Sequence, residues 1–199
     1  MPARTDRKLT VADIADLRAY ERERDAFRAE VIALKKRRRV AVGPFVTLLF
    51  ENRTTIRFQI QEIARVERIL TDEAIQSELD VYNPLIPEPG TLAATLFIEL
   101  TTKAELAEWL PKLVGIERAV ELRAGDVVVP GRPDAAHEAQ LTRDAVTSSV
   151  HYAHFALTPA QIDLVAGGPV ELAVTLETYS YATKLHELLI TELLTDLRR

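Results

Sequence analysis

The residues best suited to chemistry gather between positions 53 and 83. Arg53 and Arg57 stand four residues apart, where a helix is expected to begin at Thr54 or Thr55. A helix start presents N–H donors and a positive dipole end, and guanidinium groups bind carboxylates or phosphates bidentately. This arrangement predicts a site for a small anion. Its candidate ligand-binding residues are Arg53, Arg57, Gln59, Glu62, Arg65, Tyr82 and Asn83.

Two interpretations of these arginines stay open. In the first they receive an anionic ligand, and Glu62 is the proton acceptor if the site is enzymatic. In the second, Arg53 and Arg57 pair with acidic side chains of the chain's own acidic body, which carries 23 Asp or Glu against 13 Lys or Arg after residue 39. Glu62 and Arg65 lie one helical turn apart and could form an internal pair.

The histidines offer a weaker hypothesis. His151 and His154 are three apart, which on the predicted strand puts the two rings on opposite faces. A metal site would need distant ligands such as His137 or His186, and none has motif spacing. His151 is therefore a weak metal candidate, and no cofactor is expected. The absence of cysteine excludes thiolate nucleophiles, disulfides and Cys-type zinc sites.

A basic run ends the first predicted helix, and three interpretations of it remain. Cations are favoured at a helix C-terminus, so the run could simply be a solvated helix end. It could instead dock to an acidic protein surface, or bind nucleic acid, although aromatics that would stack on bases are not interleaved with it. The candidate docking residues are Lys35, Lys36, Arg37, Arg38 and Arg39.

Periodicity and capping signals predict the elements that must position these side chains. Thr10 and Asp13 resemble a capping box at the start of one helix of about 27 residues, whose apolar stripe Arg24 interrupts. Arg24 either packs its stem with its head in water or forms an ion pair across a partner helix. Further helices are predicted from 55 to 70 with Leu70 facing inward, at 72–82, from 102, from 159 and at 184–197, with strands at 45–50, 91–100, 120–129 (a hairpin), 146–157 and 170–179.

These elements indicate an α+β fold, with a largely antiparallel sheet of about six strands and helices packed on it. The chain of 199 residues is long enough for one domain, with a helical arm at 1–39 and a body at 40–199. The pattern between 134 and 145 favours no element. The leucine-rich C-terminal helix either lies on the sheet or forms an oligomer seam. No segment reaches the roughly 20 apolar residues that cross a bilayer, and no secretory signal opens the chain, so a soluble cytoplasmic protein is expected.

Several stretches resemble a bacterial family known as a domain of unknown function, DUF3501. They are LTVADI (9–14), YER (20–22), IALKKRRRV (32–40), LLFENR (48–53), RFQIQE (57–62) and YNPLIP (82–87). The similarity extends from Leu9 to Leu197, while His154 departs from the family pattern. Genes of the family are often found beside those of rubrerythrin-like and iron–sulfur oxidoreductases. The resemblance therefore implies a role near a redox protein, and it assigns no catalytic residue.

The preferred hypothesis is a non-catalytic accessory protein that docks to a redox partner, and the alternative of an oligomer seam leaves a homodimer open. The first alternative is a small-anion-binding protein or enzyme with an arginine-lined cleft. The second, binding of nucleic acid through residues 35–39, is the least favoured.

Overall fold

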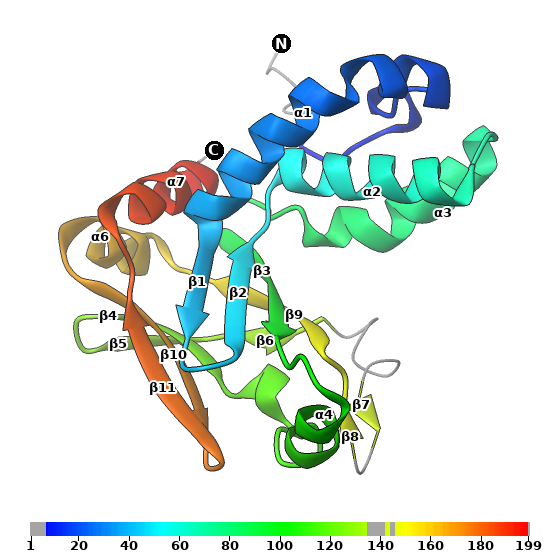
Figure 1. Cartoon of the computed structure of the whole chain (residues 1–199). Coiled ribbons are helices and arrows are strands. Elements are labelled where there is room, and N and C mark those ends of the chain that lie inside the picture. The colour runs from blue at the N-terminus through cyan, green and yellow to red at the C-terminus, as the bar shows by residue number, and fades with distance from the viewer. Residues whose placement is uncertain (1–6, 135–141, 144–145, 199) are drawn as a thin grey trace. The chain divides into compact units, whose positions relative to one another are not determined.

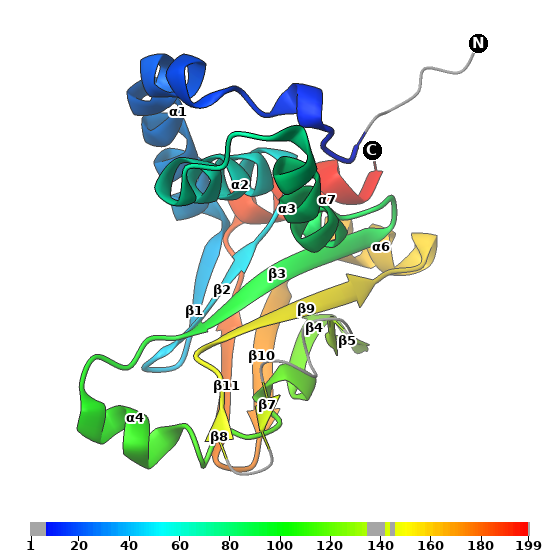
Figure 2. The ribbon, with the colours of Figure 1, turned by 90° about the vertical axis from the view of Figure 1, so that its right-hand side faces the viewer.

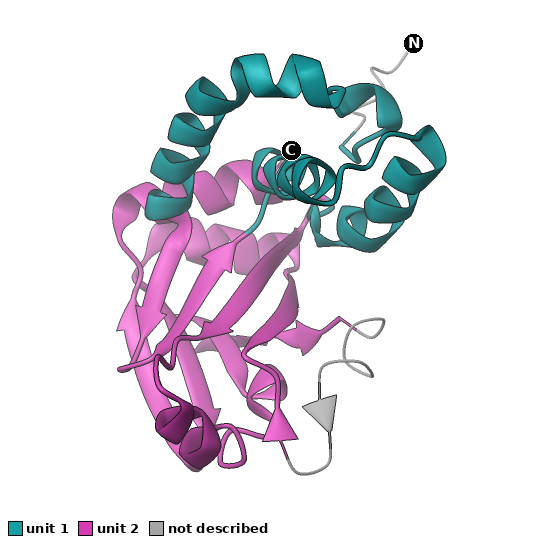
Figure 3. Cartoon of the chain, turned by 45° about the vertical axis from the view of Figure 1, so that its right-hand side comes forward, with its two compact units in different colours: residues 1–37, 51–88 teal, residues 38–50, 89–199 magenta. Residues whose placement is uncertain are grey.

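The computed structural model describes residues 7–134, 142–143 and 146–198 and divides into two compact units. Unit 1 comprises residues 1–37 and 51–88, and unit 2 comprises residues 38–50 and 89–199 (Figure 3). The N-terminal helix thus shares a unit with the segment 51–88. This division differs from the predicted arm at 1–39 and body at 40–199, because the sequence pattern gave no sign that the chain returns to the first unit.

Unit 1 is helical. It contains a 3₁₀ turn, η1 (Val11–Asp13), and three α-helices, α1 (Leu17–Arg38), α2 (Arg53–Glu67) and α3 (Asp72–Tyr82), followed by a second 3₁₀ turn, η2 (Asn83–Leu85). The predicted helix from Thr10 is wrong at its start. Asp13 does accept the Thr10 N–H at 2.8 Å, but this capping contact begins only the single 3₁₀ turn η1. The α-helix begins at Leu17, where Asp16 caps the Ala19 N–H.

Helix α3 buries both of its predicted inward residues, whereas α2 follows its predicted apolar stripe only in part. Asn52 caps α2 by accepting the Thr55 N–H, and Ile56 and Ile60 are fully buried. Leu70 was expected to face inward, but it is 79% exposed. The reason is that the helix ends at Glu67, and Arg68 after it adopts a left-handed conformation with φ 54°. Helix α3 has the predicted bounds.

Unit 2 contains two main antiparallel sheets, which confirms the α+β class. The five-stranded sheet has the order β1-β2-β3-β9-β6, and the four-stranded sheet has the order β11-β10-β4-β5. The strands of the first are β1 (Arg39–Val42), β2 (Val46–Phe50), β3 (Thr91–Ile98), β9 (Val150–Ala156) and β6 (Arg132–Pro133). Those of the second are β11 (Tyr179–Lys184), β10 (Val170–Leu176), β4 (Val120–Ala124) and β5 (Val127–Pro130), and a small pair is formed by β7 (Thr142–Arg143) and β8 (Val146–Thr147).

Strands β1 and β11 were not predicted, and their edges lie next to each other. The Tyr179 hydroxyl donates to the Val42 carbonyl at 2.7 Å and accepts the Val46 N–H at 3.2 Å, so it sits inside the β1–β2 hairpin. Thr183 donates its hydroxyl to the Ala41 carbonyl at 2.7 Å. Side chains of β11 therefore connect the edges of the two sheets at this point.

Helices lie at both ends of the strands of unit 2. Helices α6 (Pro159–Gly167) and α7 (Glu187–Arg198) pack together at one end of the strands, and α4 (Lys103–Trp109) lies with β7 and β8 at the other (Figures 1 and 2). The predicted caps of α4 and α6 are confirmed, because Thr102 and Thr158 accept the N–H groups of Glu105 and Gln161. A 3₁₀ turn, η3 (Ile116–Arg118), precedes β4.

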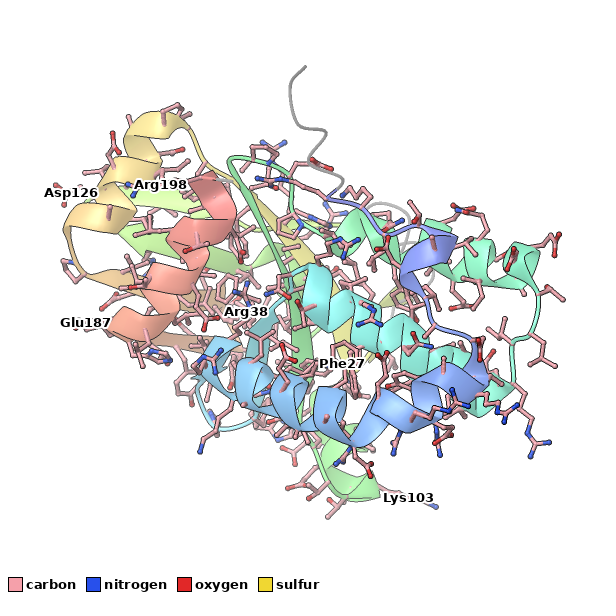
Figure 4. The ribbon with its side chains drawn as sticks, turned by 90° about the horizontal axis from the view of Figure 1, so that it is seen from above. Phe27, Arg38, Lys103, Asp126, Glu187 and Arg198 are labelled. Atoms are coloured by element: carbon pink, nitrogen blue, oxygen red, sulfur yellow. The ribbon has the colours of Figure 1, made fainter. Side chains whose placement is uncertain are left out.

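Helix α7 lies on the sheets, as one of the two sequence interpretations proposed. Leu189, Leu193 and Leu197 are buried in the same core as the inward residues of both sheets. Arg38, the last residue of α1 and the first residue of unit 2, contacts the polar side of this helix. Its guanidinium pairs with Glu192 and Asp196 and donates through Nε to the Phe50 carbonyl at 2.8 Å, and only 1% of Arg38 is exposed (Figure 4).

Candidate functional site

The N-terminal segment, defined here as residues 7–15, is bound to the rest of unit 1 through its backbone. The Asn83 side-chain amide accepts the Leu9 N–H and donates to the Leu9 carbonyl, each at 2.8 Å. The Gln61 amide does the same for Ala15, at 3.0 and 2.8 Å. A primary amide matches a peptide group in this paired geometry, since it carries one acceptor and two donors. Two positions of the segment are thus held in the same way.

The two predicted arginines converge on one residue of that segment. Arg53 pairs with the Asp13 carboxylate at 2.6 Å, and Arg57 donates through Nε to the Asp13 carbonyl at 2.9 Å. Burial alone would raise the pKa of Asp13, but hydrogen bonds from Thr10 and the Arg53 guanidinium outweigh it and hold the pKa below its usual value. The Asp13 carboxylate is therefore bound as an anion.

Arg57 also connects α2 to α1. Its Nη2 pairs with Glu23 at 2.9 Å, and its guanidinium carbon lies 4.7 Å from the centre of the Phe27 ring. Phe27 in turn meets the Phe58 ring edge-on, with centroids 5.6 Å apart, and Figure 4 shows it between the two helices. This arginine is thus occupied by the backbone of the N-terminal segment and by two side chains of α1.

Glu62 lies at the centre of a second polar group. It accepts the Tyr20 hydroxyl at 2.7 Å and two bonds from Arg24, at 2.8 and 2.9 Å. These bonds hold the pKa of Glu62 below its usual value, with the bidentate Arg24 bond as the main cause, while burial and the Glu62 carboxylate raise the pKa of Tyr20. Arg24 therefore forms an ion pair across two helices of the same chain.

This group predicts an acid-dependent part of the stability. Because the pKa of Glu62 is lowered on folding, its contribution is present above the unfolded-state pKa and is lost as the pH falls through the folded-state pKa. We expect Glu62→Gln to cost about 1 kcal/mol at pH 7, since the charged bonds are partly open to solvent. Urea unfolding at pH 7 and at pH 3 measures both effects. The difference between variant and wild type should shrink at pH 3, and an equal difference at both pH values would contradict the assignment.

The other candidate ligand residues are distributed over the same unit. Arg65 pairs with Glu21 of α1 at 2.6 Å, and Gln59 and Tyr82 are half-buried. The internal partners of Arg53, Arg57 and Arg65 are Asp13, Glu23 and Glu21, so they come from the basic N-terminal part and not from the acidic remainder of the chain. The internal pairing of the second interpretation is therefore observed, but its carboxylates come from a different part of the chain than it proposed.

The basic run does not present one continuous surface. Lys36 is exposed, and Lys35 lies 5.6 Å from the centre of the Phe58 ring. Arg37 is exposed and donates to the Ala33 carbonyl, whereas Arg39 pairs with Glu99 at 3.2 Å. Arg38 is buried in unit 2, which corrects its prediction as a docking residue. Docking or nucleic-acid binding by the whole run would need Arg38 and Arg39, whose guanidinium groups already pair with carboxylates of the same chain.

The two histidines point to opposite faces of β9, as the strand pattern predicted. His151 is 2% exposed and its Nε2 lies 2.8 Å from the Thr147 hydroxyl and 2.9 Å from the Ser148 carbonyl; burial lowers the pKa of this imidazole. His154 pairs with Asp134 at 3.2 Å. Among residues 7–134, 142–143 and 146–198, no three His, Asp or Glu side chains form a group that could hold a metal ion, and His137 lies outside these ranges.

Sequence reasoning missed the carboxylate and amide that define this site. Asp13 was interpreted only as a capping residue, and Gln61 was omitted from the candidate ligand residues. The one signal in the sequence was the place of Gln61 directly after Ile60, a residue of the predicted apolar stripe of α2. The structure shows that Gln61 is fully buried. A buried glutamine must satisfy an acceptor and two donors, but nothing in the pattern names Ala15 as the partner.

Comparisons with known proteins identify a protein family and a solved structure that this chain resembles. A family model described as "Protein of unknown function (DUF3501)" matches residues 8–197. A crystal structure of a novel protein of unknown function from Burkholderia pseudomallei K96243, at 1.90 Å resolution, is 38% identical, with a TM-score of 0.88 over 96% of this chain and 99% of that one. No curated protein matches the sequence. In the described part of the chain, no helix is long and apolar enough to span a bilayer.

Proposed function

Because this chain belongs to the DUF3501 family of proteins of unknown function, we propose from the geometry of unit 1 that it is a non-catalytic accessory protein that binds a protein partner. The observation that carries the proposal is the pair of reciprocal amide–backbone contacts at Leu9 and Ala15. Main-chain hydrogen bonds are the means by which many domains bind peptide segments. The polar side chains that could serve catalysis are instead engaged with a stretch of polypeptide and with α1.

The class of partner we propose is a redox protein of the iron–sulfur or rubrerythrin type. The support for this class is the family resemblance, and the support for protein binding is the backbone recognition in unit 1. Under this proposal the partner carries the redox centre, and the present chain supplies the docking surface.

Affinity capture tests the proposal. Tagged full-length protein is incubated with lysate of the source organism, captured proteins are identified by mass spectrometry, and binding is repeated with the purified candidate. We expect a redox protein that is retained at low salt and binds again in purified form. Recovery of only chaperones and ribosomal proteins at every salt concentration would overturn the proposal.

A second candidate function, binding of a small anion, rests on one observation. Arg53 Nε is a buried atom that has no hydrogen-bond partner in the described part of the chain, although Nη2 of the same guanidinium pairs with Asp13. Thermal-shift measurements with phosphate and short dicarboxylates test this alternative. It predicts a rise in Tm for wild type and for Arg28→Ala, an exposed arginine of α1, and no rise for Arg53→Ala. Equal rises in all three proteins would place any anion site elsewhere.

A further inference from the structure

One set of the contacts that hold the N-terminal segment involves only its main chain. Five hydrogen bonds join the side chains of Asn83, Gln61 and Arg57 to main-chain atoms of Leu9, Asp13 and Ala15; the side chains donate three of them and accept two. Two side chains of the segment bind the main chain of the rest of the unit in turn. Arg7 and Lys8 donate to main-chain carbonyls within residues 83–87. Every polypeptide offers the same main-chain groups, so another segment of the same shape could make the first set of bonds.

Side chains of the segment add selectivity through charge and burial. Lys8 pairs with Glu88 at 2.9 Å. Leu9 is 3% exposed, and the Asp13 carboxylate is bound by Arg53. Between them Thr10 is extended, with φ −120° and ψ 168°, and its N–H and hydroxyl bond to Asp13, which closes the 3₁₀ turn. The site therefore selects an apolar residue, followed directly by Thr or Ser and, three residues further on, by Asp.

The segment is also attached in a way that permits release. Thr10 and Ala12 are exposed, and only Leu9 is buried among the residues of the segment whose burial the structure describes. Hydrogen bonds at a protein surface contribute little net free energy each, because water competes for the same groups. Terminal segments with few buried apolar side chains open far more readily than a domain core.

We infer that Arg53, Arg57, Gln61 and Asn83, together called the clamp residues, form a docking site for a Leu-Thr-x-x-Asp type segment of a protein partner, and that residues 7–15 occupy this site in cis. The inference rests on the proposed function and adds to it a location, a peptide chemistry and a mode of regulation. The tethered segment has a high effective concentration, so it acts as an autoinhibitor that a partner must displace.

A labelled peptide tests the inference on the full-length protein. The probe is a synthetic peptide with the sequence of residues 7–16, RKLTVADIAD, carrying fluorescein at its C-terminus, and fluorescence anisotropy reports binding. The Leu9→Asp chain places a charge at the buried position of the cis segment and so weakens the competitor. We expect this chain to bind the peptide more tightly than wild type by on the order of tenfold or more.

Matched variants show whether the peptide binds at the clamp residues. Adding Asn83→Ala to the Leu9→Asp chain should abolish the gain, whereas adding Gln76→Ala, which removes an exposed amide from α3, should leave it intact. A peptide that itself carries Leu9→Asp should not bind. If circular dichroism shows that the Leu9→Asp chain is unfolded, the Leu9→Ala chain replaces it, because alanine removes packing without burying a charge.

Two results would overturn the inference. A folded Leu9→Asp or Leu9→Ala chain that binds the peptide no better than wild type would show that the clamp residues do not accept a segment in trans. A concentration-dependent dimer that the peptide dissociates would assign the site to the N-terminal segment of a second copy, and not to a partner. If the peptide does not bind but a redox protein is captured, this docking site is rejected and the proposed function stands. If the peptide binds but no redox protein is captured, the proposed class of partner is rejected and the docking site stands.

Discussion

Replacing Arg38 by alanine should destabilise unit 2 by about 3 kcal/mol or more. The guanidinium is almost completely buried, and it is the cation for two carboxylates of α7, Glu192 and Asp196, whose side chains are 23% and 14% exposed. Its loss also removes the donor to the Phe50 carbonyl. Removing one member of a buried ion pair is costly because the remaining charges keep their desolvation penalty. Urea unfolding followed by the fluorescence of Trp109, the single tryptophan and a residue of unit 2, measures the change.

A second variant at position 38 separates the effect of charge from that of geometry, and a variant at position 36 is the control. Arg38→Lys retains the charge, but it lacks the planar fork that reaches several acceptors together, so its loss should fall between wild type and Arg38→Ala. Lys36→Ala removes an exposed cation of the same run and should change the free energy of unfolding by less than about 0.5 kcal/mol. Equal small effects at positions 36 and 38 would show that Arg38 does not anchor α7.

Gly43→Ala should destabilise unit 2 by about 2–4 kcal/mol, the sum of a strained backbone and a steric overlap. Gly43 has φ +78°, a conformation that residues with a side chain rarely adopt. A Cβ at this position would lie 2.5 Å from the Tyr179 hydroxyl and 2.7 Å from the Tyr181 ring. It would therefore displace the hydroxyl that joins Val42 to Val46 within the hairpin.

Gly125 provides the matched control for this prediction. It also has a positive φ, +57°, in the turn between β4 and β5, but a Cβ there would meet no atom within 4 Å. Gly125→Ala should therefore show only the backbone cost, about 1 kcal/mol. The same urea titration compares the two variants. If their losses are equal, Tyr179 and Tyr181 do not fix the position of the β1–β2 hairpin.

The sequence predicted those elements whose signals are local. Helix α3 was predicted with its observed bounds because its signals are local: Ile75 and Leu79 face inward, and Pro84 follows shortly after Tyr82 and stops the helix. The caps at Thr102 and Thr158 were found for the same reason. Strand β11 was missed because its residues alternate weakly and its stability depends on pairing with β10 and on side-chain bonds to β1. Such long-range contacts leave no periodic pattern in the segment that makes them.

The candidate site shows the same limit. Arg53 and Arg57 were recognised because two arginines near a helix start are a local pattern with a chemical meaning. Their partners were not, because Asp13 lies 40 positions earlier than Arg53 and already had a local interpretation as a cap. Asn83 was selected for its place in an Asn-Pro loop, yet its partner Leu9 carries no polar side chain at all. Recognition of a main chain cannot be read from the side chains of the recognised segment.

Amide hydrogen exchange of the full-length protein, measured by NMR, tests the central claim most directly: unit 1 binds residues 7–15 through their main chain. The claim predicts that the Leu9 and Ala15 N–H groups exchange at least about tenfold more slowly than in an unfolded chain. Asn83→Ala should speed exchange chiefly at Leu9, and Gln61→Ala chiefly at Ala15. Exchange of both groups at unfolded-chain rates in the wild-type protein would contradict the account.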